Sequence, residues 1–342
     1  MARPRKPQSV TIIDVAREAN VSYSTVSRVV NGFDHVKPEK RQRVLEAMER
    51  LGYVANAQAR SLAGGRSQVI GLLVRDFAHA YTGEVLRGID AELAPLEYDL
   101  MLYTSHHRNT KESVYINKLT QGVSDGLLLL LPLDPGAYLE TLHQRQFPYV
   151  VIDHQGFDDF SPTVAATNWQ GAFEATRYLI ELGHTRIGHI TGRMDVSSAL
   201  ERLQGYQAAL ASSNIAFTPE LVANGYFEQQ EGYVAAQTLL NLPQPPTAIF
   251  AANDASAIGA VEAIRSHGLS IPEDVSVVGF DDIPQAASLY PALTTVRQPL
   301  SDMGRAATRL LLKYIEDPTL PNERIVLPTE LIVRASCSEK RR

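Results

Sequence analysis

The chain has 342 residues, of which 44% are hydrophobic, so it is long enough to form two or three domains with large cores. Its single cysteine, Cys337, excludes an internal disulfide framework and a cluster of thiolate metal ligands. The net charge of −6 conceals an asymmetry, because residues 1–66 hold 12 Lys and Arg against 6 Asp and Glu, whereas the remainder is acidic. A basic amino-terminal end favours binding to a polyanion such as nucleic acid.

The amino-terminal residues 1–8 are basic, and no apolar stretch of signal-peptide length follows them. We therefore expect the protein to stay in the cytoplasm. The longest apolar run, residues 126–131, is far shorter than the roughly 20 residues that cross a bilayer. It is predicted to be a buried strand, and no membrane partner is expected.

Residues 11–30 have the pattern of two short helices joined by a tight turn. Apolar residues recur at helical spacing from Ile12 to Ala19 after a possible Thr11 cap, and again from Val26 to Val30 after Ser22. The connection is only Asn20-Val21, which predicts a helix-turn-helix unit whose second helix enters the major groove of DNA.

The exposed face of the second helix carries short polar side chains and one arginine, which suit base edges and phosphate oxygens. These side chains are Tyr23, Ser24, Thr25, Ser27 and Arg28. An ordinary polar surface is the alternative interpretation. The basic surroundings and the tight turn favour the DNA-binding interpretation.

The segment from Val21 to Gly32, Val-Ser-Tyr-Ser-Thr-Val-Ser-Arg-Val-Val-Asn-Gly, resembles the recognition helix of the lactose-repressor/galactose-repressor (LacI/GalR) family of bacterial transcription regulators. The resemblance extends over nearly the whole chain. It implies base contacts from Tyr23, Ser24 and Arg28, and phosphate contacts from Thr11, Ser22, Thr25, Ser27 and Asn31. A third helix should follow, with Pro38 first, Leu45, Met48 and Leu51 inward, and Gly52 beyond its end.

Residues 56–66 have the composition of a helix of about two turns between a capping asparagine and a pair of glycines. A helix this short is marginal in water unless DNA or a partner stabilises it. The resemblance implies a hinge helix that enters the minor groove, with Ala59 and Leu62 against the bases and Leu62 bending the duplex. A flexible linker is the alternative.

From residue 68 onward, apolar runs of strand length alternate with helical patterns, which predicts parallel sheets covered by helices. The predicted strands are residues 69–74, 99–103, 126–131, 149–152, 163–166, 186–191, 221–226, 247–251 and 275–279. The resemblance implies a periplasmic-binding-protein-like core of two doubly wound lobes that the chain crosses three times, near Asn168, Arg297 and Ile325. The helix over residues 301–316 should return to the first lobe.

The expected organisation is an all-α helix-turn-helix headpiece, a hinge helix and an α/β core. We place the headpiece at residues 1–54, the hinge at 55–66 and the core at 67–342. Within the core, the first lobe takes about residues 67–166 and 298–325, and the second about 167–297 and 326–338.

Ligands of wound α/β sheets bind beyond the carboxyl ends of the strands, where this sequence is polar. Sugar hydroxyl groups both donate and accept hydrogen bonds. A site with carboxylates, amides and an arginine around an aromatic face is therefore suited to a sugar. The resemblance implies that Arg202 holds hydroxyl groups of the effector and that the Phe227 ring stacks on it. It also implies that Asn253 and Asp281 contact the effector from the strand ends. Further candidates are Asp76, Tyr81 and Gln298. Thr167 and His154 depart from residues common in the family, which leaves the ligand open.

The sequence ends without a leucine heptad, so we expect a homodimer on a near-palindromic double-stranded operator. The predicted function is repression of carbohydrate-utilisation genes, relieved by a sugar effector and without a cofactor or metal. Corepression by a non-sugar molecule is the alternative within this class. A glycosidase using Asp76, Asp153, Asp254 or Asp281, and a transport binding protein, are alternatives that leave residues 11–66 unexplained.

Overall fold

The computed structural model describes residues 10–30, 35–53, 66–75, 77, 80–105, 109–132, 135–154 and 160–340. It divides into two compact units, residues 1–69 with 118–125, and residues 70–117 with 126–342. Among the described residues, none of the helices combines the length and apolar character needed to cross a bilayer.

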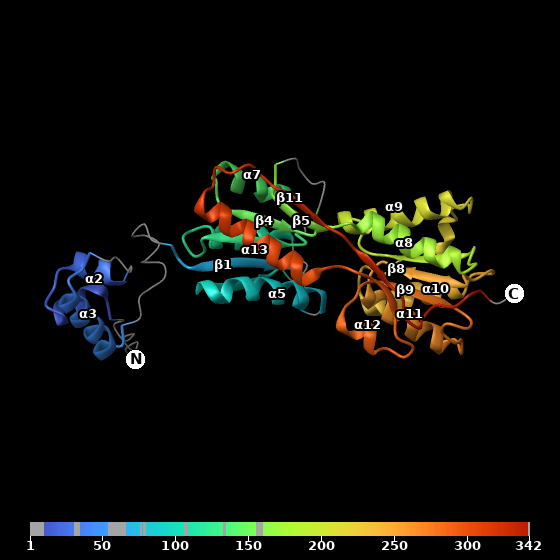
Figure 1. The fold of residues 1–342 in the computed structure, drawn as a ribbon, viewed down its shortest axis with the longest axis horizontal. Helices are drawn as coiled ribbons and strands as arrows, with labels where there is room; N and C mark the ends of the chain where they lie inside the picture. Colours follow the sequence, from blue (N-terminus) through green and yellow to red (C-terminus); the bar gives the residue numbers. More distant parts are fainter. Residues whose placement is uncertain are drawn as a thin grey trace, which may run out of the picture. The chain divides into compact units, whose positions relative to one another are not determined.

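The amino-terminal helices are α1 (Ile12–Glu18), α2 (Tyr23–Val30) and α3 (Pro38–Leu51) (Figure 1). They share a small core in which Val15, Val26 and Val44 are completely buried. Asn20 takes a left-handed φ of 50° in the turn between α1 and α2, a conformation that asparagine tolerates better than most residues. The predicted helix-turn-helix unit and its third helix are confirmed.

One prediction for the inner face of α3 was wrong. Leu45 is 48% exposed, because the buried stripe runs through Val44, Ala47, Met48 and Leu51 at helical spacing and passes beside Leu45. The two ends of α3 are as predicted, with Pro38 first and Gly52 left-handed after the last residue. The hinge positions Ala59 and Leu62, together with Asn31, lie outside the described residues.

The first sheet of the larger unit has the strand order β11-β5-β4-β3-β1-β2. Its strands are β1 (Val69–Val74), β2 (Asp99–Thr104), β3 (Gly126–Leu130), β4 (Tyr149–Ile152), β5 (Thr163–Ala166) and β11 (Arg324–Leu327). The pairs from β1 through β3, β4 and β5 to β11 are parallel, with Leu72 opposite Leu128 and Leu128 opposite Val150. Completely apolar strands such as β3 are expected where helices cover both faces.

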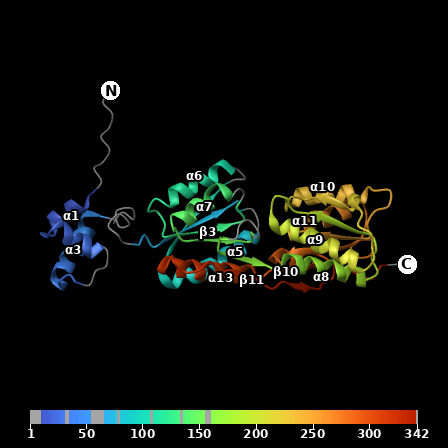
Figure 2. The ribbon, with the colours of Figure 1, turned by 90° about the horizontal axis from the view of Figure 1, so that it is seen from above.

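Helices α5 (Ala80–Leu93) and α13 (Leu300–Glu316) cover one face of this sheet, and α7 (Gly136–Gln144) lies on the other, as does α6 (Asn109–Leu119) (Figure 2). A short 3₁₀ turn, η1 (Ala94–Leu96), follows α5. Helices α5 and α13 approach closely because Gly88 and Gly304 face the partner backbone. A Cβ on Gly88 would lie 1.9 Å from the Ser301 carbonyl oxygen, so no side chain fits there.

The second sheet has the order β12-β10-β9-β8-β6-β7. Its strands are β6 (Ile187–Thr191), β7 (Val222–Asn224), β8 (Ala248–Ala251), β9 (Ser276–Asp281), β10 (Thr294–Arg297) and β12 (Glu330–Ile332). Strand β12 runs antiparallel to β10, whereas the pairs from β10 through β9, β8 and β6 to β7 are parallel. The predicted strand 221–226 is shorter, because a 3₁₀ turn, η2 (Pro219–Leu221), precedes it and left-handed residues follow it.

Each face of the second sheet has its own core. Helices α8 (Asn168–Glu181) and α9 (Ser197–Ser212) cover one face, and α10 (Gln229–Leu240) and α11 (Asp254–Ser266) cover the other, next to the short α12 (Pro284–Ser288) (Figure 1). The predicted pair of wound α/β lobes is therefore confirmed.

The chain passes between the sheets three times, after β5, after β10 and after β11. Helix α13 packs on the first sheet through Leu300, Met303 and Leu311. The last passage comes after Leu327, slightly beyond Ile325, because β11 pairs with β5 as far as Leu327. Strands β10, β11 and β12 were not predicted from the sequence.

Candidate functional site

The amino-terminal unit presents a polar helix end and an exposed recognition face. The Ser22 Oγ atom lies 2.8 Å from Ser24 Oγ and 2.9 Å from Thr25 Oγ1, and it accepts a hydrogen bond from the Thr25 amide at 3.3 Å. Ser22 thus caps α2, and its hydroxyl group and the first amides of α2 lie at the helix end where phosphates bind.

Beyond this end, Tyr23 is 57% exposed and Arg28 is exposed, whereas Val26 and Val29 are buried. Thr11 caps α1 in a capping box with Asp14, and Ser27 is half-buried on α2. The described candidates on α1 and α2 therefore lie outside the fully buried core of the three helices.

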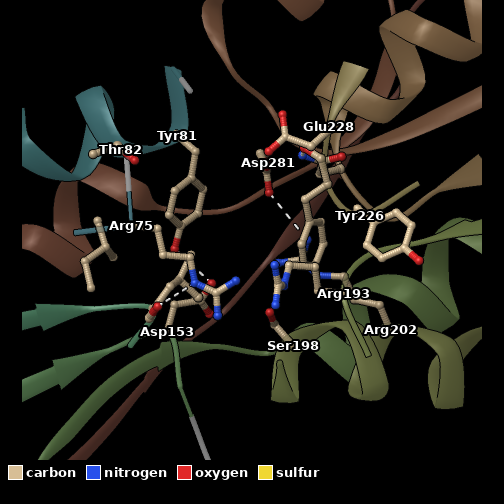
Figure 3. Close-up of a pocket in the computed structure, with 14 residues that line it drawn as sticks. Arg75, Tyr81, Thr82, Asp153, Arg193, Ser198, Arg202, Tyr226, Glu228 and Asp281 are labelled. Carbon is tan, nitrogen blue, oxygen red and sulfur yellow. Dashed lines mark hydrogen bonds and ion pairs between the residues drawn. The ribbon is translucent and has the colours of Figure 1, made fainter. Parts of the chain in front are cut away.

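A cleft in the larger unit opens between side chains of the two lobes. From the first lobe it is lined by Arg75 after β1, Tyr81 and Thr82 of α5, Leu130 and Leu131 at the end of β3, and Asp153 after β4. From the second lobe it is lined by Arg193, Ser198, Arg202, Tyr226, Phe227, Glu228, Asn253 and Asp281. Figure 3 shows these two groups facing each other. The space between them is about 670 Å³ when its open mouth is included.

Arg202 of α9 is 2% exposed and is held in place from several sides. Its Nε donates to Asn168 Oδ1 at 2.9 Å, one terminal nitrogen donates to the Ala252 carbonyl at 2.5 Å, and the same nitrogen lies 3.6 Å from Asp281 Oδ1. Its guanidinium carbon lies 3.8 Å from the centre of the Phe280 ring. A buried, oriented arginine of this kind is pre-organised to hold hydroxyl or carboxylate oxygens.

A hydrogen-bonded chain connects Arg202 to the first lobe. Asn168 also donates to Asp153 Oδ1 at 3.5 Å, and the Tyr81 hydroxyl donates to Asp153 Oδ2 at 2.8 Å. Burial raises the pKa of Asp153, although Arg202, Tyr81 and Asn168 oppose that shift. Burial and the charge of Asp153 also raise the pKa of Tyr81 well above its usual range, so this phenol stays a proton donor. Asn168 thus connects both walls of the cleft at the point where the chain passes between them.

The backbone positions the aromatic ring of Phe227 against Gly192. Tyr226 and Phe227 are consecutive left-handed residues with φ of 54° and 68°, and Asn253 Nδ2 donates to the Phe227 carbonyl at 2.9 Å. A Cβ on Gly192 would lie 2.0 Å from Phe227 Cζ, so the ring lies directly on the glycine. Left-handed non-glycine residues cluster at functional sites, where the surrounding structure pays for the strain.

The acidic strand-end residues have different environments. Asp281, with a left-handed φ of 119°, lines the cleft and accepts a hydrogen bond from Gln298 Nε2 at 2.7 Å. Gln298 is buried behind Asp281 and is not among the lining residues. Asp254 is completely buried and accepts from Thr295 Oγ1 at 2.6 Å and from the Ile283 amide at 2.9 Å. Burial, and then the charge of Asp281, raises the pKa of Asp254 well above its usual range. Asp254 is therefore a structural group.

Five of the seven predicted effector residues line the cleft, namely Tyr81, Arg202, Phe227, Asn253 and Asp281. Asp76 lies outside the described residues. Arg75, Arg193, Tyr226 and Glu228 were missed. Arg75 directly follows β1 and Arg193 follows β6 by two residues, so a stricter use of the strand-end rule would have found both arginines. In the described part of the chain, no group of three or more His, Cys, Asp or Glu could hold a metal ion.

Two family models match the chain: Bacterial regulatory proteins, lacI family, over residues 11–56, and Periplasmic binding protein-like domain, over residues 176–337. The HTH-type transcriptional repressor CytR of Escherichia coli (strain K12) is 36% identical over 340 residues, 98% of each chain. The solved transcriptional regulator CelR-cellobiose complex has a TM-score of 0.72 and 34% identity over 96% of this chain and 99% of that chain. The lac repressor dimer bound to operator and the anti-inducer ONPF has a TM-score of 0.84 and 28% identity over 97% and 100%.

Proposed function

Because the chain belongs to the lacI family of bacterial transcriptional repressors, we propose that it represses carbohydrate-utilisation genes and leaves its operator when a sugar occupies the cleft. Members of this family regulate transcription and are not enzymes, so the cleft carboxylates are binding groups. In this proposal the headpiece is residues 1–54, the hinge 55–66 and the core 67–342. Such a regulator acts in the cytoplasm, where its DNA lies.

The observation that carries the sugar assignment is the combination of Arg202, Asp281 and the ring of Phe227 on one wall of the cleft. An arginine donates hydrogen bonds to hydroxyl oxygens, and a carboxylate accepts hydrogen bonds from hydroxyl groups. An aromatic ring covers the apolar face of a pyranose. The relative solved with cellobiose supports a sugar ligand for this fold and sequence type.

Coupling to DNA follows from the two-lobed cleft. A ligand that contacts Tyr81 on one lobe and Arg202 on the other favours one arrangement of the lobes, and the chain through Asn168 transmits the same preference. In a homodimer, a changed lobe arrangement separates the two hinges, which then lose their short helices. Linkage requires that operator DNA weakens sugar binding by the same factor.

The operator is proposed to be a near-palindrome, because two identical headpieces related by a twofold axis read the same sequence twice. Tyr23, Ser24 and Arg28 contact bases, and Thr11, Ser22, Thr25, Ser27 and Asn31 contact phosphates. Ala59 and Leu62 of the hinge enter the minor groove between the half-sites. The operator-bound dimer of a 28% identical relative supports this arrangement.

The test uses the full chain and an operator selected from a pool of random duplexes. Fluorescence anisotropy should show sugar-induced release in the wild type, whereas Arg202→Ala and Asp281→Ala keep operator affinity and need at least about tenfold more sugar. Phe227→Ala should behave in the same way without removing a buried charge. Arg186→Ala is the matched control, because Arg186 pairs with Glu220 on the surface, away from the cleft.

Two outcomes would change the proposal. Release of DNA from Arg202→Ala at the wild-type sugar concentration would contradict the assignment of the cleft. Tighter operator binding on addition of ligand would favour the alternative, in which a small molecule acts as a corepressor.

A further inference from the structure

A second, more open hollow adjoins the cleft on the side of the second lobe. This outer hollow is lined by Arg193, Tyr226, Glu228 and Glu231, and the first three of these side chains also line the cleft. Its empty space is about 650 Å³, including open solvent. The two hollows are therefore neighbouring compartments with a shared wall, and the inner one alone holds the buried groups Arg202 and Asp281.

Each compartment has its own aromatic ring. Phe227 lies against Gly192 in the inner compartment, whereas the adjacent Tyr226 is 48% exposed and lines both. Both residues have left-handed backbone conformations, which place Phe227 in the inner compartment and Tyr226 on the wall that the two compartments share. The Tyr226 amide donates to Asn224 Oδ1 at 2.9 Å, which fixes this turn. Exposing a large aromatic ring at the mouth of a cleft is typical of a binding surface.

Charged side chains also lie around the Tyr226 ring. Arg193 is held by Asp195 through two hydrogen bonds, of 2.7 and 3.1 Å, which orients its guanidinium plane. Glu228 precedes α10 and Glu231 lies in its first turn. In Figure 3, Arg193, Tyr226 and Glu228 lie together on one side of the cleft. Planar guanidinium and carboxylate groups beside an aromatic face are suited to the hydroxyl-bearing edge and the apolar face of a sugar ring.

The charges of the described lining residues favour a neutral ligand. Arg75, Arg193 and Arg202 are balanced by Asp153, Glu228 and Asp281, and the outer hollow adds the acidic Glu231. A phosphorylated sugar would meet as many carboxylates as arginines, whereas an uncharged polyhydroxylated ligand uses both as hydrogen-bonding partners.

Building on the proposed function, we propose that the effector is a neutral oligosaccharide of at least two rings, with one ring in the inner compartment on Phe227 and the next on Tyr226. Tyr226, Arg193 and Glu231 form the outer subsite. This subsite sets the chain length that the repressor recognises, because a monosaccharide fills only the inner compartment.

Isothermal titration calorimetry on the full chain tests this proposal with matched probes. The panel pairs glucose with cellobiose and maltose, galactose with lactose, and xylose with xylobiose, and it includes glucose 6-phosphate. We expect one disaccharide to bind at least about tenfold more tightly than its monosaccharide. Tyr226→Ala should remove most of that difference by weakening the disaccharide far more than the monosaccharide. Tyr226→Phe should keep the difference, and Phe227→Ala should weaken both sugars.

Each contrary outcome has a separate meaning. Equal affinity for a monosaccharide and its disaccharide, or an equal loss of both in Tyr226→Ala, would overturn the outer subsite while leaving a sugar effector in place. Tighter binding of glucose 6-phosphate than of any disaccharide would overturn the neutral ligand. Absence of binding to every sugar, with operator binding intact, would overturn both the sugar effector and the subsite that depends on it.

Discussion

The position of Phe227 depends on the missing side chain of Gly192, and Gly192→Ala tests that dependence. The added Cβ would lie 2.0 Å from Phe227 Cζ and 2.3 Å from both Cε atoms, whereas carbon atoms in contact are about 3.5–4.0 Å apart. The ring must therefore retreat by roughly 1.5 Å or more. Gly192 is not among the left-handed glycines, so the ring contact, and not backbone strain, is the source of the cost.

Forcing a methyl group into such a contact costs about 1–3 kcal/mol of folding free energy. For a domain of this size each kcal/mol lowers the melting temperature by about 2–4 °C. Displacing the ring also removes the inner stacking surface, so sugar affinity should fall by about tenfold or more. Operator affinity in the absence of sugar should stay unchanged, because the headpiece is a separate unit.

The assay is thermal unfolding of the wild type, Gly192→Ala, Phe227→Leu and the double variant, followed by sugar titration of each. Phe227→Leu removes the ring that the new methyl group strikes, so Gly192→Ala should cost much less in that background. Gly83→Ala is the matched control, since a Cβ on Gly83 meets nothing within 4 Å and the residue lies in α5. An unchanged melting temperature in Gly192→Ala, or the same loss with and without the Phe227 ring, would refute the reasoning.

Two further predictions concern the headpiece and the pH dependence of stability. Tyr23→Ala and Arg28→Ala remove exposed side chains of α2 and should not unfold the headpiece. In competition anisotropy, each variant should reduce the preference for operator over scrambled duplex by about 1–3 kcal/mol. An unchanged preference would contradict the assignment of base contacts to these side chains. Burial, and then the charge of Asp153, raises the pKa of Glu201 from 4.5 to about 7. Between these two pH values the folded state keeps a proton that the unfolded chain releases. The free energy of unfolding therefore falls as the pH rises from 4.5 to about 7. Glu201→Gln should flatten this fall by about 1–2 kcal/mol in denaturant titrations, after allowance for partial exposure, and an unaltered pH profile would contradict the assigned environment.

Much of the fold could be predicted because its signals are local. Helical spacing of Val26 and Val29 marks α2, and apolar runs mark β1, β3 and β4 within about one residue of their bounds. Strands β10 to β12 escaped prediction because they are short and lack a continuous apolar run. Their pairing with distant strands, β10 with β9 and β11 with β5, defines them.

The sequence by itself determined which elements form and which polar side chains follow the strands, because both depend on residues close together in the chain. The strand-end rule alone treats Asp254 and Asp281 alike, since each follows or ends an apolar strand, and only the family resemblance singled out Asp281. Only the tertiary structure sends Asp254 inward to Thr295 and the Ile283 amide, and leaves Asp281 in the cleft opposite Arg202. The physical reason is that a side chain's direction at a strand end depends on the backbone of the following turn and on partners supplied by distant strands. The same dependence hid the pair Gly192 and Phe227, whose contact joins residues far apart in the sequence.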